Sequence, residues 1–497
     1  MRTFEALLLL ANLLAFVATT VPLTWLRHAA LAALILAITQ VLIEGSRWQM
    51  IPAYALTGLF FLVWLLHNTA EIGAPAGQER TSRLAVTLVF GLGVLGLALS
   101  TALPIILPVF SFSRPSGPYA IGTLTYHWVD AKRPEIFSTD PEARRELMVQ
   151  LWYPAKVDAS PPRAPYIQDA DAISSALARV KQLPDFVFGQ LKYVITNAIP
   201  AAPLTDDQPN YPLLIFLEGA SGYRQMNTFQ VEELVSHGYI VAAIDQPYTA
   251  ASVVFPDGRR ANAIPLEQMK TLIHQSYSRS KQAPMLNGRT LEQGIIAYLA
   301  QDVTFVLGQL AALNRADPNN LLTGRLNLQQ IGTFGVSLGG IVAAEACRLE
   351  PRLRACLIMD AAMPTEVVQF GLQQPTMWIT RDAETMRLER RRSGGWPELE
   401  IVEHQTTMRA TFENSHGDRH FVQVPNMFHL NLTDIPHWSP LSPWLGITGP
   451  IDGRRAHGII NAYSVAFFDH HLKGRLAALL EESARQFPEV LLETRRP

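Results

Sequence analysis

Apolar residues dominate the first 110 positions in four long stretches, at residues 4–20, 26–43, 50–66 and 84–110. Each stretch approaches or exceeds the roughly 20 residues that a helix needs to cross the hydrocarbon core of a bilayer. Short polar segments separate the stretches, which almost lack the polar stripe typical of a helix on the surface of a soluble domain. We therefore expect four membrane-spanning helices and a multi-pass protein of the cell membrane.

The charges that flank these stretches do not indicate an orientation. Four crossings place both ends of the helical region on one side of the membrane, and basic residues are enriched on the cytoplasmic side of membrane proteins. The basic residues are divided equally between the two sides, with Arg2, Arg47 and Arg114 on one and Arg27, Arg80 and Arg83 on the other. The sequence leaves open which side carries the rest of the chain.

Beyond residue 111 the pattern changes to short apolar runs that alternate with helical periodicity. The runs that predict strands are residues 148–153, 213–217, 239–244, 331–335, 355–359, 376–380 and 421–424. Nearly continuous apolar runs are typical of parallel strands that are buried on both faces, and their alternation with helices predicts an α/β fold with a mostly parallel sheet. We expect a transmembrane region at residues 1–112 and a catalytic domain at 113–497. An insertion at about 160–205 is either a lid over the site or an ordinary surface excursion.

Composition excludes several other classes of function. Charged residues make up 17% of the chain, the net charge is −2, and no long basic run is present, so nucleic acid is not an expected partner. The two cysteines, Cys347 and Cys356, provide neither a disulfide framework nor the spacing of a metal site. The chain lacks H-E-x-x-H and P-loop motifs as well, so we expect neither a metal nor an organic cofactor.

One serine motif directly follows a predicted strand. Residues 335–339 read Gly-Val-Ser-Leu-Gly, the only G-x-S-x-G in the chain, and an alanine-rich helical pattern follows at 338–349. This strand–turn–helix order is typical of the nucleophile elbow of an α/β-hydrolase, in which a strained turn exposes the serine hydroxyl. We therefore expect Ser337 to be a nucleophile.

A serine hydroxyl needs a base that removes its proton, and in this fold the acid and the histidine follow the serine along the chain. The base is expected in the loop after the last strand. His429 lies in that position, five residues beyond the run at 421–424, and His437 is the alternative.

Two aspartates are candidates for the acid that orients this histidine. Asp360 directly follows the predicted strand at 355–359, and Asp382 follows the strand at 376–380. Either carboxylate would fix the imidazole tautomer and stabilise its protonated form. The strand pattern does not decide between them.

Two backbone N–H groups are expected to hold the negative charge that develops on the substrate oxygen. One belongs to Leu338, directly after the nucleophile. The other comes from the loop after the strand at 213–217, where residues 218–222 read Glu-Gly-Ala-Ser-Gly, and the N–H of Ala220 is the candidate.

Over roughly residues 115–475 the chain resembles the plasma-type platelet-activating factor acetylhydrolase family. The segments that carry the resemblance are residues 117–119, 151–154, 216–224, 335–340, 355–363, 374–375 and 429–434. The resemblance implies that Asp360 rather than Asp382 is the acid, and it supports His429 as the base. In one departure, Glu218 stands where the family usually has a histidine, directly before the first glycine of the oxyanion loop.

Together these residues predict a serine carboxylic ester hydrolase. The resemblance implies a calcium-independent enzyme that cleaves short acyl esters, including those of phospholipids. The four apolar stretches predict the bilayer as a second partner. The alternatives are a general carboxylesterase or polyester hydrolase of the same fold, and a non-catalytic membrane sensor or scaffold. The sequence does not indicate an oligomeric state.

Overall fold

The computed structural model describes residues 1–21, 24–70, 83–157, 161–277, 283, 285–481 and 486–497 of the chain. The chain divides into two compact units. The first consists of Met1–Phe110, Gly189–Tyr193 and Trp438–Leu441, and the second consists of Ser111–Phe188, Val194–His437 and Ser442–Pro497. The main chain passes from the first unit to the second after Phe110, close to the boundary expected from composition.

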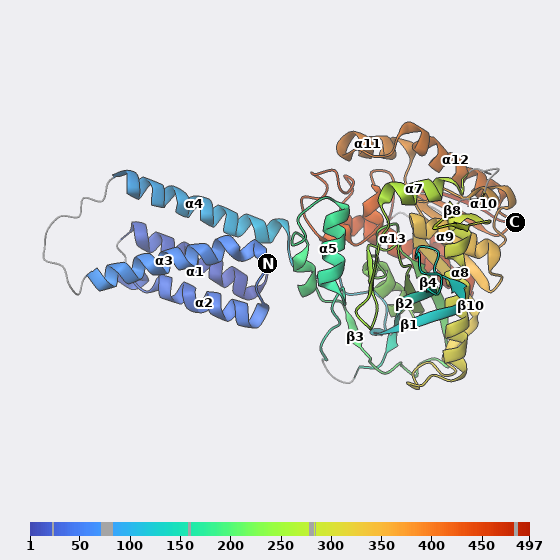
Figure 1. Cartoon of the computed structure of the whole chain (residues 1–497), viewed down its shortest axis with the longest axis horizontal. Helices are drawn as coiled ribbons and strands as arrows, with labels where there is room; N and C mark the ends of the chain where they lie inside the picture. The colour runs from blue at the N-terminus through green and yellow to red at the C-terminus, as the bar shows by residue number, and fades with distance from the viewer. Residues whose placement is uncertain (22–23, 71–82, 158–160, 278–282, 284, 482–485) are drawn as a thin grey trace. The chain divides into compact units, whose positions relative to one another are not determined.

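The first unit is helical (Figure 1). Its α-helices are α1 (Thr3–Thr20), α2 (Ala29–Glu44), α3 (Ile51–Ala70) and α4 (Arg83–Ile106). Among the described residues, Thr24–Glu44 and Trp48–Leu66 are long and apolar enough to cross a membrane, whereas the apolar helices Thr3–Thr19 and Phe90–Ile106 are shorter. Gly294–Arg315 of the second unit meets the same criterion although its side chains lie in a protein core, so length and composition alone do not define a span.

Polar groups in the helical unit lie inside, and large apolar side chains lie outside. The buried guanidinium of Arg47 donates from Nε to Glu5 Oε1 at 2.7 Å, and Asn12 Nδ2 donates to the backbone oxygen of Ala53 at 3.1 Å. By contrast, Leu42 is 79% exposed and Ile43 is 64% exposed. The unit therefore has buried polar contacts beside its buried apolar side chains, while other large apolar side chains are exposed on its surface.

The second unit is built on a 10-stranded sheet in the order β14-β13-β12-β11-β10-β4-β5-β2-β1-β3. The strands from β13 to β5 in that order pair in parallel, whereas β14, β2 and β1 pair antiparallel with their neighbours β13, β5 and β2. Their bounds are β1 (Ala120–Pro134), β2 (Arg144–Ala155), β3 (Ala198–Pro200), β4 (Tyr211–Leu217), β5 (Ile240–Asp245), β10 (Leu326–Val336), β11 (Leu353–Met359), β12 (Thr376–Thr380), β13 (Arg419–Gln423) and β14 (Leu491–Arg495).

Helices cover both faces of this sheet (Figure 1). On one side α8 (Gly294–Arg315) packs on α9 (Leu338–Leu349), and on the other α6 (Thr228–Ser236) packs on α13 (Gly453–Lys473). The remaining helices are α5 (Ala170–Val180), α7 (Leu266–His274), α10 (Thr365–Phe370), α11 (Ala383–Ser393) and α12 (Glu398–Asn414). Two short hairpins, β6 (Ser252–Val254) with β7 (Arg260–Asn262) and β8 (Met285–Leu286) with β9 (Arg289–Thr290), complete the unit. The predicted α/β class with a mostly parallel sheet is confirmed.

Two antiparallel strands, β14 at one edge and β1 next to the other edge, were not predicted. β1 is 15 residues long, but its pattern mixes buried and exposed positions and ends in polar residues, so it lacks the continuous apolar run of a central strand. β14 is a short edge strand with only partly buried side chains. The expected insertion at 160–205 contains α5 and the edge strand β3.

Candidate active site

Ser337 occupies a strained turn between the central strand β10 and helix α9. Its backbone has φ 57° and ψ −124°, which are unfavourable angles for a residue with a side chain. The flanking glycines make the turn possible, because a Cβ on Gly335 would lie 2.3 Å from the backbone oxygen of Gly339, and one on Gly339 would lie 2.0 Å from that of Leu217. The structure therefore has the nucleophile elbow that the motif predicts, with a half-buried serine at its tip.

Asp360 directly follows β11, the strand that pairs with β10, and lies beside the turn at Ser337. Val336 and Met359 are paired in the two parallel strands, and the N–H of Ser337 donates to the backbone oxygen of Met359 at 2.9 Å. Ser337 and Asp360 are therefore the first residues beyond two adjacent strands, whose spacing is about 4.8 Å. The carboxyl ends of both strands meet at this edge of the sheet.

Four side chains donate to the buried carboxylate of Asp360. Oδ2 accepts from His429 Nδ1 at 2.6 Å and from Arg381 Nε at 2.8 Å, and Oδ1 accepts from Thr380 Oγ1 at 3.0 Å and from His404 Nε2 at 3.1 Å. Burial alone would raise the pKa of Asp360, but the charge of Arg381 and the two histidines outweigh it and hold this pKa well below 3.8. Asp360 is therefore an anion over the whole physiological range of pH.

His429 lies after β13, at the start of a short 3₁₀ turn (His429–Leu432). Because Nδ1 faces a carboxylate, it carries the proton, and Nε2 keeps a lone pair. Within the described part of the chain Nε2 has no hydrogen-bond partner, and no bond joins it to the Ser337 hydroxyl; such bonds commonly tighten only when substrate binds. Burial lowers the pKa of His429 below 6.5, although the bond to Asp360 acts in the opposite direction. The neutral form, which can accept a proton, is favoured at neutral pH.

The two alternative residues lie elsewhere. Asp382 caps helix α11, where its carboxylate accepts from Thr385 N at 2.7 Å and Thr385 Oγ1 at 3.0 Å. The His437 ring packs against the rings of Phe112 and His457, with centroids 5.5 and 4.9 Å away. The structure thus brings Ser337, Asp360 and His429 to one edge of the sheet, and gives Asp382 and His437 other partners.

The expected oxyanion loop lies against Ser337. A Cβ on Gly219 would lie 3.3 Å from Cβ of Ser337, so only glycine lets the loop approach this closely with ease. Within the described residues, neither the Ala220 N–H nor the Leu338 N–H has a hydrogen-bond partner. Both donors predicted for a developing oxyanion are therefore free to bind one.

Sequence reasoning missed three residues around Asp360. His404 comes from the middle of α12, Arg381 follows β12, and the ring of Trp396 stands edge-on to both histidines, 5.2 Å from His429 and 5.8 Å from His404 between centroids. The Arg381 guanidinium lies 4.6 Å from the centre of the Trp396 ring. A helix residue and a loop tryptophan carry no motif, so only the tertiary structure reveals them.

A parallel sheet with helices on both faces and a strained serine between a central strand and a helix defines the α/β-hydrolase class. Within that class, a family model described as platelet-activating factor acetylhydrolase, isoform II, matches residues 109–478. The chain belongs to this family.

Individual relatives agree with the family. The chain is 22% identical to a platelet-activating factor acetylhydrolase of Gallus gallus, over 67% of this chain and 79% of that protein. It is also 22% identical to a probable 1-alkyl-2-acetylglycerophosphocholine esterase of Arthroderma benhamiae, over 77% of this chain and 93% of the relative. The solved structure of a ferulic acid esterase from Streptomyces cinnamoneus is similar at a TM-score of 0.58 and 28% identity, covering 78% of this chain and 99% of the other. The chain is a serine ester hydrolase that acts on carboxylic esters.

Proposed function

We propose that Ser337, His429 and Asp360 form the catalytic triad of this esterase. The observation that carries the proposal is the 2.6 Å contact between His429 Nδ1 and Asp360 Oδ2, on the strand beside the Ser337 elbow. His429 Nε2 takes the Ser337 proton while Oγ bonds to the ester carbonyl carbon. The N–H groups of Leu338 and Ala220 bind the resulting oxyanion.

Collapse of this intermediate completes the first half of the reaction. The C–O bond to the alcohol breaks, and protonated His429 returns its proton to the leaving alkoxide. Water then attacks the acyl-serine with His429 again acting as base, which releases the carboxylic acid and regenerates Ser337. Asp360 stays ionised throughout and stabilises the imidazolium in each half-reaction.

The proposed substrate is a short acyl ester on an amphipathic alcohol such as a lysophospholipid. The family and the names of the two relatives support an acetyl ester of a glycerophosphocholine. The likeness to a ferulic acid esterase favours a second candidate, a general carboxylesterase with a different acyl or alcohol group. The folds are the same, so the difference lies in the walls of the substrate site.

The proposed location is a membrane that the N-terminal helices cross as a multi-pass anchor. The internal polar contacts and external apolar side chains of the helical unit support it. An anchor of this kind would keep the catalytic unit at a lipid surface, where an amphipathic ester is concentrated. Extraction of membranes at alkaline pH should leave the full chain in the pellet, and release into the supernatant would contradict the anchor.

The test of the triad uses a fluorophosphonate probe on the detergent-solubilised full chain. Wild type should be labelled and Ser337→Ala should not, and the variant should lose at least about 10³-fold in kcat while keeping its melting transition. A folded wild type that is neither labelled nor active would overturn the proposal. Acetyl, butanoyl, octanoyl and palmitoyl esters of one phospholipid, tested beside a feruloyl ester, then separate the two substrate candidates.

A further inference from the structure

Glu218 is a buried carboxyl group at the base of the proposed oxyanion loop. It directly follows β4 and is 2% exposed. Its Oε1 atom accepts from the N–H of Gln246 at 2.9 Å, and among the described residues its Oε2 atom has no hydrogen-bond partner. The side chain therefore points towards the end of β5, beneath the loop, rather than towards the oxyanion.

The two carboxylates that act on Glu218, and a third that shares an arginine with one of them, each contact an arginine. The pairs are Asp302 with Arg145 and Arg133, Glu135 with Arg145, and Asp245 with Arg224. The described residues give Glu218 no such cation. A buried carboxylate without a counter-ion is costly, and it avoids that cost by binding a proton.

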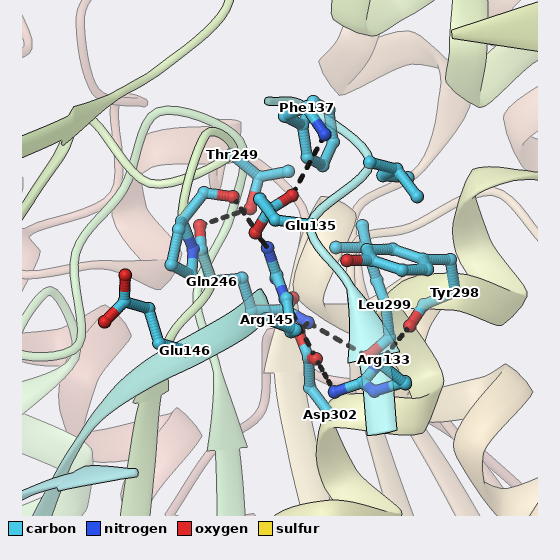
Figure 2. Close-up of polar contacts among 12 residues, drawn as sticks. Arg133, Glu135, Phe137, Arg145, Glu146, Gln246, Thr249, Tyr298, Leu299 and Asp302 are labelled. Atoms are coloured by element: carbon cyan, nitrogen blue, oxygen red, sulfur yellow. Dashed lines mark hydrogen bonds and ion pairs between the residues drawn. The ribbon is translucent and has the colours of Figure 1, made fainter. Parts of the chain in front are cut away.

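The residue that Glu218 contacts is held in place by the charged cluster shown in Figure 2. Gln246 donates from Nε2 to Asp302 Oδ2 at 2.9 Å and to the backbone oxygen of Leu299 at 3.0 Å. Arg145 donates to both carboxylate oxygens of the same Asp302, at 3.1 and 2.7 Å, and to the backbone oxygen of Pro247 at 3.2 Å. The segment that begins at Gln246 is therefore held by one hydrogen bond from Arg145 and by two from the side-chain amide of Gln246.

The same segment supports the oxyanion loop. Thr249 donates from Oγ1 to the backbone oxygen of Gln246 at 2.8 Å, and its own backbone oxygen accepts from Ser221 N at 2.7 Å. On the other side of the loop, a Cβ on Gly339 would lie 2.6 Å from the backbone oxygen of Glu218. The backbone of Glu218 is thus packed against the nucleophile elbow while its side chain is anchored in the cluster below.

We propose that Glu218 is a positioning residue that acts as a neutral carboxylic acid and, through Gln246, holds the Ala220 N–H in place for the oxyanion. The inference rests on the proposed function, because it assigns a role within the same site. A neutral group is required here, since a negative charge beneath the loop would oppose the negative charge that develops above it.

The charged groups that face Glu218 agree with this assignment. Burial raises the pKa of Glu218 well above 4.5, Asp245 on β5 and Asp302 on α8 raise it further, and the N–H of Gln246 lowers it. Because this pKa is raised in the folded protein, the contribution of the protonated form is present at low pH and is lost as pH rises through it. Activity should therefore fall on the alkaline side when Glu218 ionises.

The test compares Glu218→Gln with Glu218→Ala in the full chain. Glutamine keeps an acceptor for Gln246 N and a donor in place of the acid proton, so kcat at neutral pH should stay within about threefold of wild type, and the alkaline loss should disappear. Alanine removes both the acceptor and the donor, so the Ala220 N–H should shift from its place in the oxyanion site. Because this N–H is not a contact to the bound substrate, kcat should fall by about 10- to 100-fold with little change in KM. Glu232→Gln, the same change at another buried glutamate on α6, is the matched control and should leave kcat unchanged.

Two results would overturn the assignment. If folded Glu218→Gln loses as much kcat as Glu218→Ala, the ionised carboxylate is needed, and if neither variant loses kcat, the residue does not position the loop. Melting transitions separate either result from misfolding. Fluorophosphonate labelling of wild type separates this inference from the proposed function, because an active, labelled wild type with an indifferent Glu218 refutes only the inference.

Discussion

Two buried carboxyl groups flank β10, the strand that leads into Ser337, and their pKa values are shifted in opposite directions. Asp360 follows β11 and Glu218 follows β4, the two strands that pair with β10, and they are 1% and 2% exposed. Asp360 accepts from four side chains, among them Arg381, whereas Glu218 accepts from one backbone N–H and faces two other acids. Burial is the same in both, so the donors around each carboxyl group decide its charge.

The charge of each carboxyl group matches the charge that develops next to it in the proposed reaction. An anion beside the base stabilises the imidazolium that forms when His429 takes the Ser337 proton. On the other side of β10 the substrate oxygen becomes negative, and a neutral acid avoids repulsion there. The comparison predicts that replacing the Asp360 carboxylate with a neutral amide lowers kcat severely, whereas replacing the neutral Glu218 carboxyl group with an amide has a mild effect.

Asp360→Asn should produce the largest effect. Asparagine has nearly the same shape, but it cannot stabilise the imidazolium and favours the wrong tautomer of His429, so kcat should fall by about 10⁴-fold. The equivalent change on the other side, Glu218→Gln, should leave kcat close to wild type. The measurement is kcat on one acetyl ester for both variants, with melting transitions to confirm folding. A loss below about tenfold in a folded Asp360→Asn would mean that the two carboxyl groups do not differ in the proposed way.

Much of this comparison could be predicted from the sequence, because central parallel strands are continuous apolar runs. β4 and β12 are fully buried over every residue, so their positions, and that of the serine motif after β10, follow from the hydrophobic pattern. Asp360 and Asp382 both follow such strands, and the pattern alone does not tell them apart. The resemblance to the family favours Asp360, and in the structure Asp382 accepts from Thr385 N at the start of α11.

The charge states could not be predicted, because they depend on residues that are distant in the chain. His404 is 44 residues beyond Asp360, and Asp302 is 56 residues beyond Gln246. Neither spacing is a motif, and both contacts exist only because helices α12 and α8 pack beside the sheet. The sequence shows that Glu218 departs from the family pattern. The direction of its side chain and the lack of a cation beside it depend on the fold.

The loss of activity at acidic pH tests the environment of His429, the histidine that contacts Asp360. kcat/KM should fall as pH decreases through the pKa of His429, which burial places below 6.5. Trp396 contributes to that burial, so Trp396→Ala should raise this pKa by about half a unit to one unit and shift the acidic limb upwards. At the pH of the wild-type midpoint the variant should therefore be about two- to sixfold less active, with little change above neutral pH.

The control for this shift is Trp444→Ala, since Trp444 is 88% exposed and should leave the pH profile unchanged. The measurement is kcat/KM across the acidic range for the three proteins. A limb that moves downwards in Trp396→Ala, or does not move, would mean that another group titrates there. The pKa of Asp360 lies well below 3.8, so protonation of that carboxylate should reduce kcat/KM only at a pH below that of the His429 limb.

Asp382→Ala should have the smallest effect and should separate the two aspartates. The carboxylate of Asp382 accepts from Thr385 N at the start of α11, so its loss should cost about 1 kcal/mol of unfolding free energy. Asp452, which caps α13 by accepting from Arg455 N, is the matched control, and Asp452→Ala should cost a similar amount. Neither variant should change kcat, because neither carboxylate contacts His429.

Denaturant unfolding together with kcat on the acetyl ester measures both quantities. If folded Asp382→Ala loses 10³-fold or more in kcat, the loss is about as large as that of a triad member. Asp382 would then be the triad acid, and the residues around Asp360 would have a structural role.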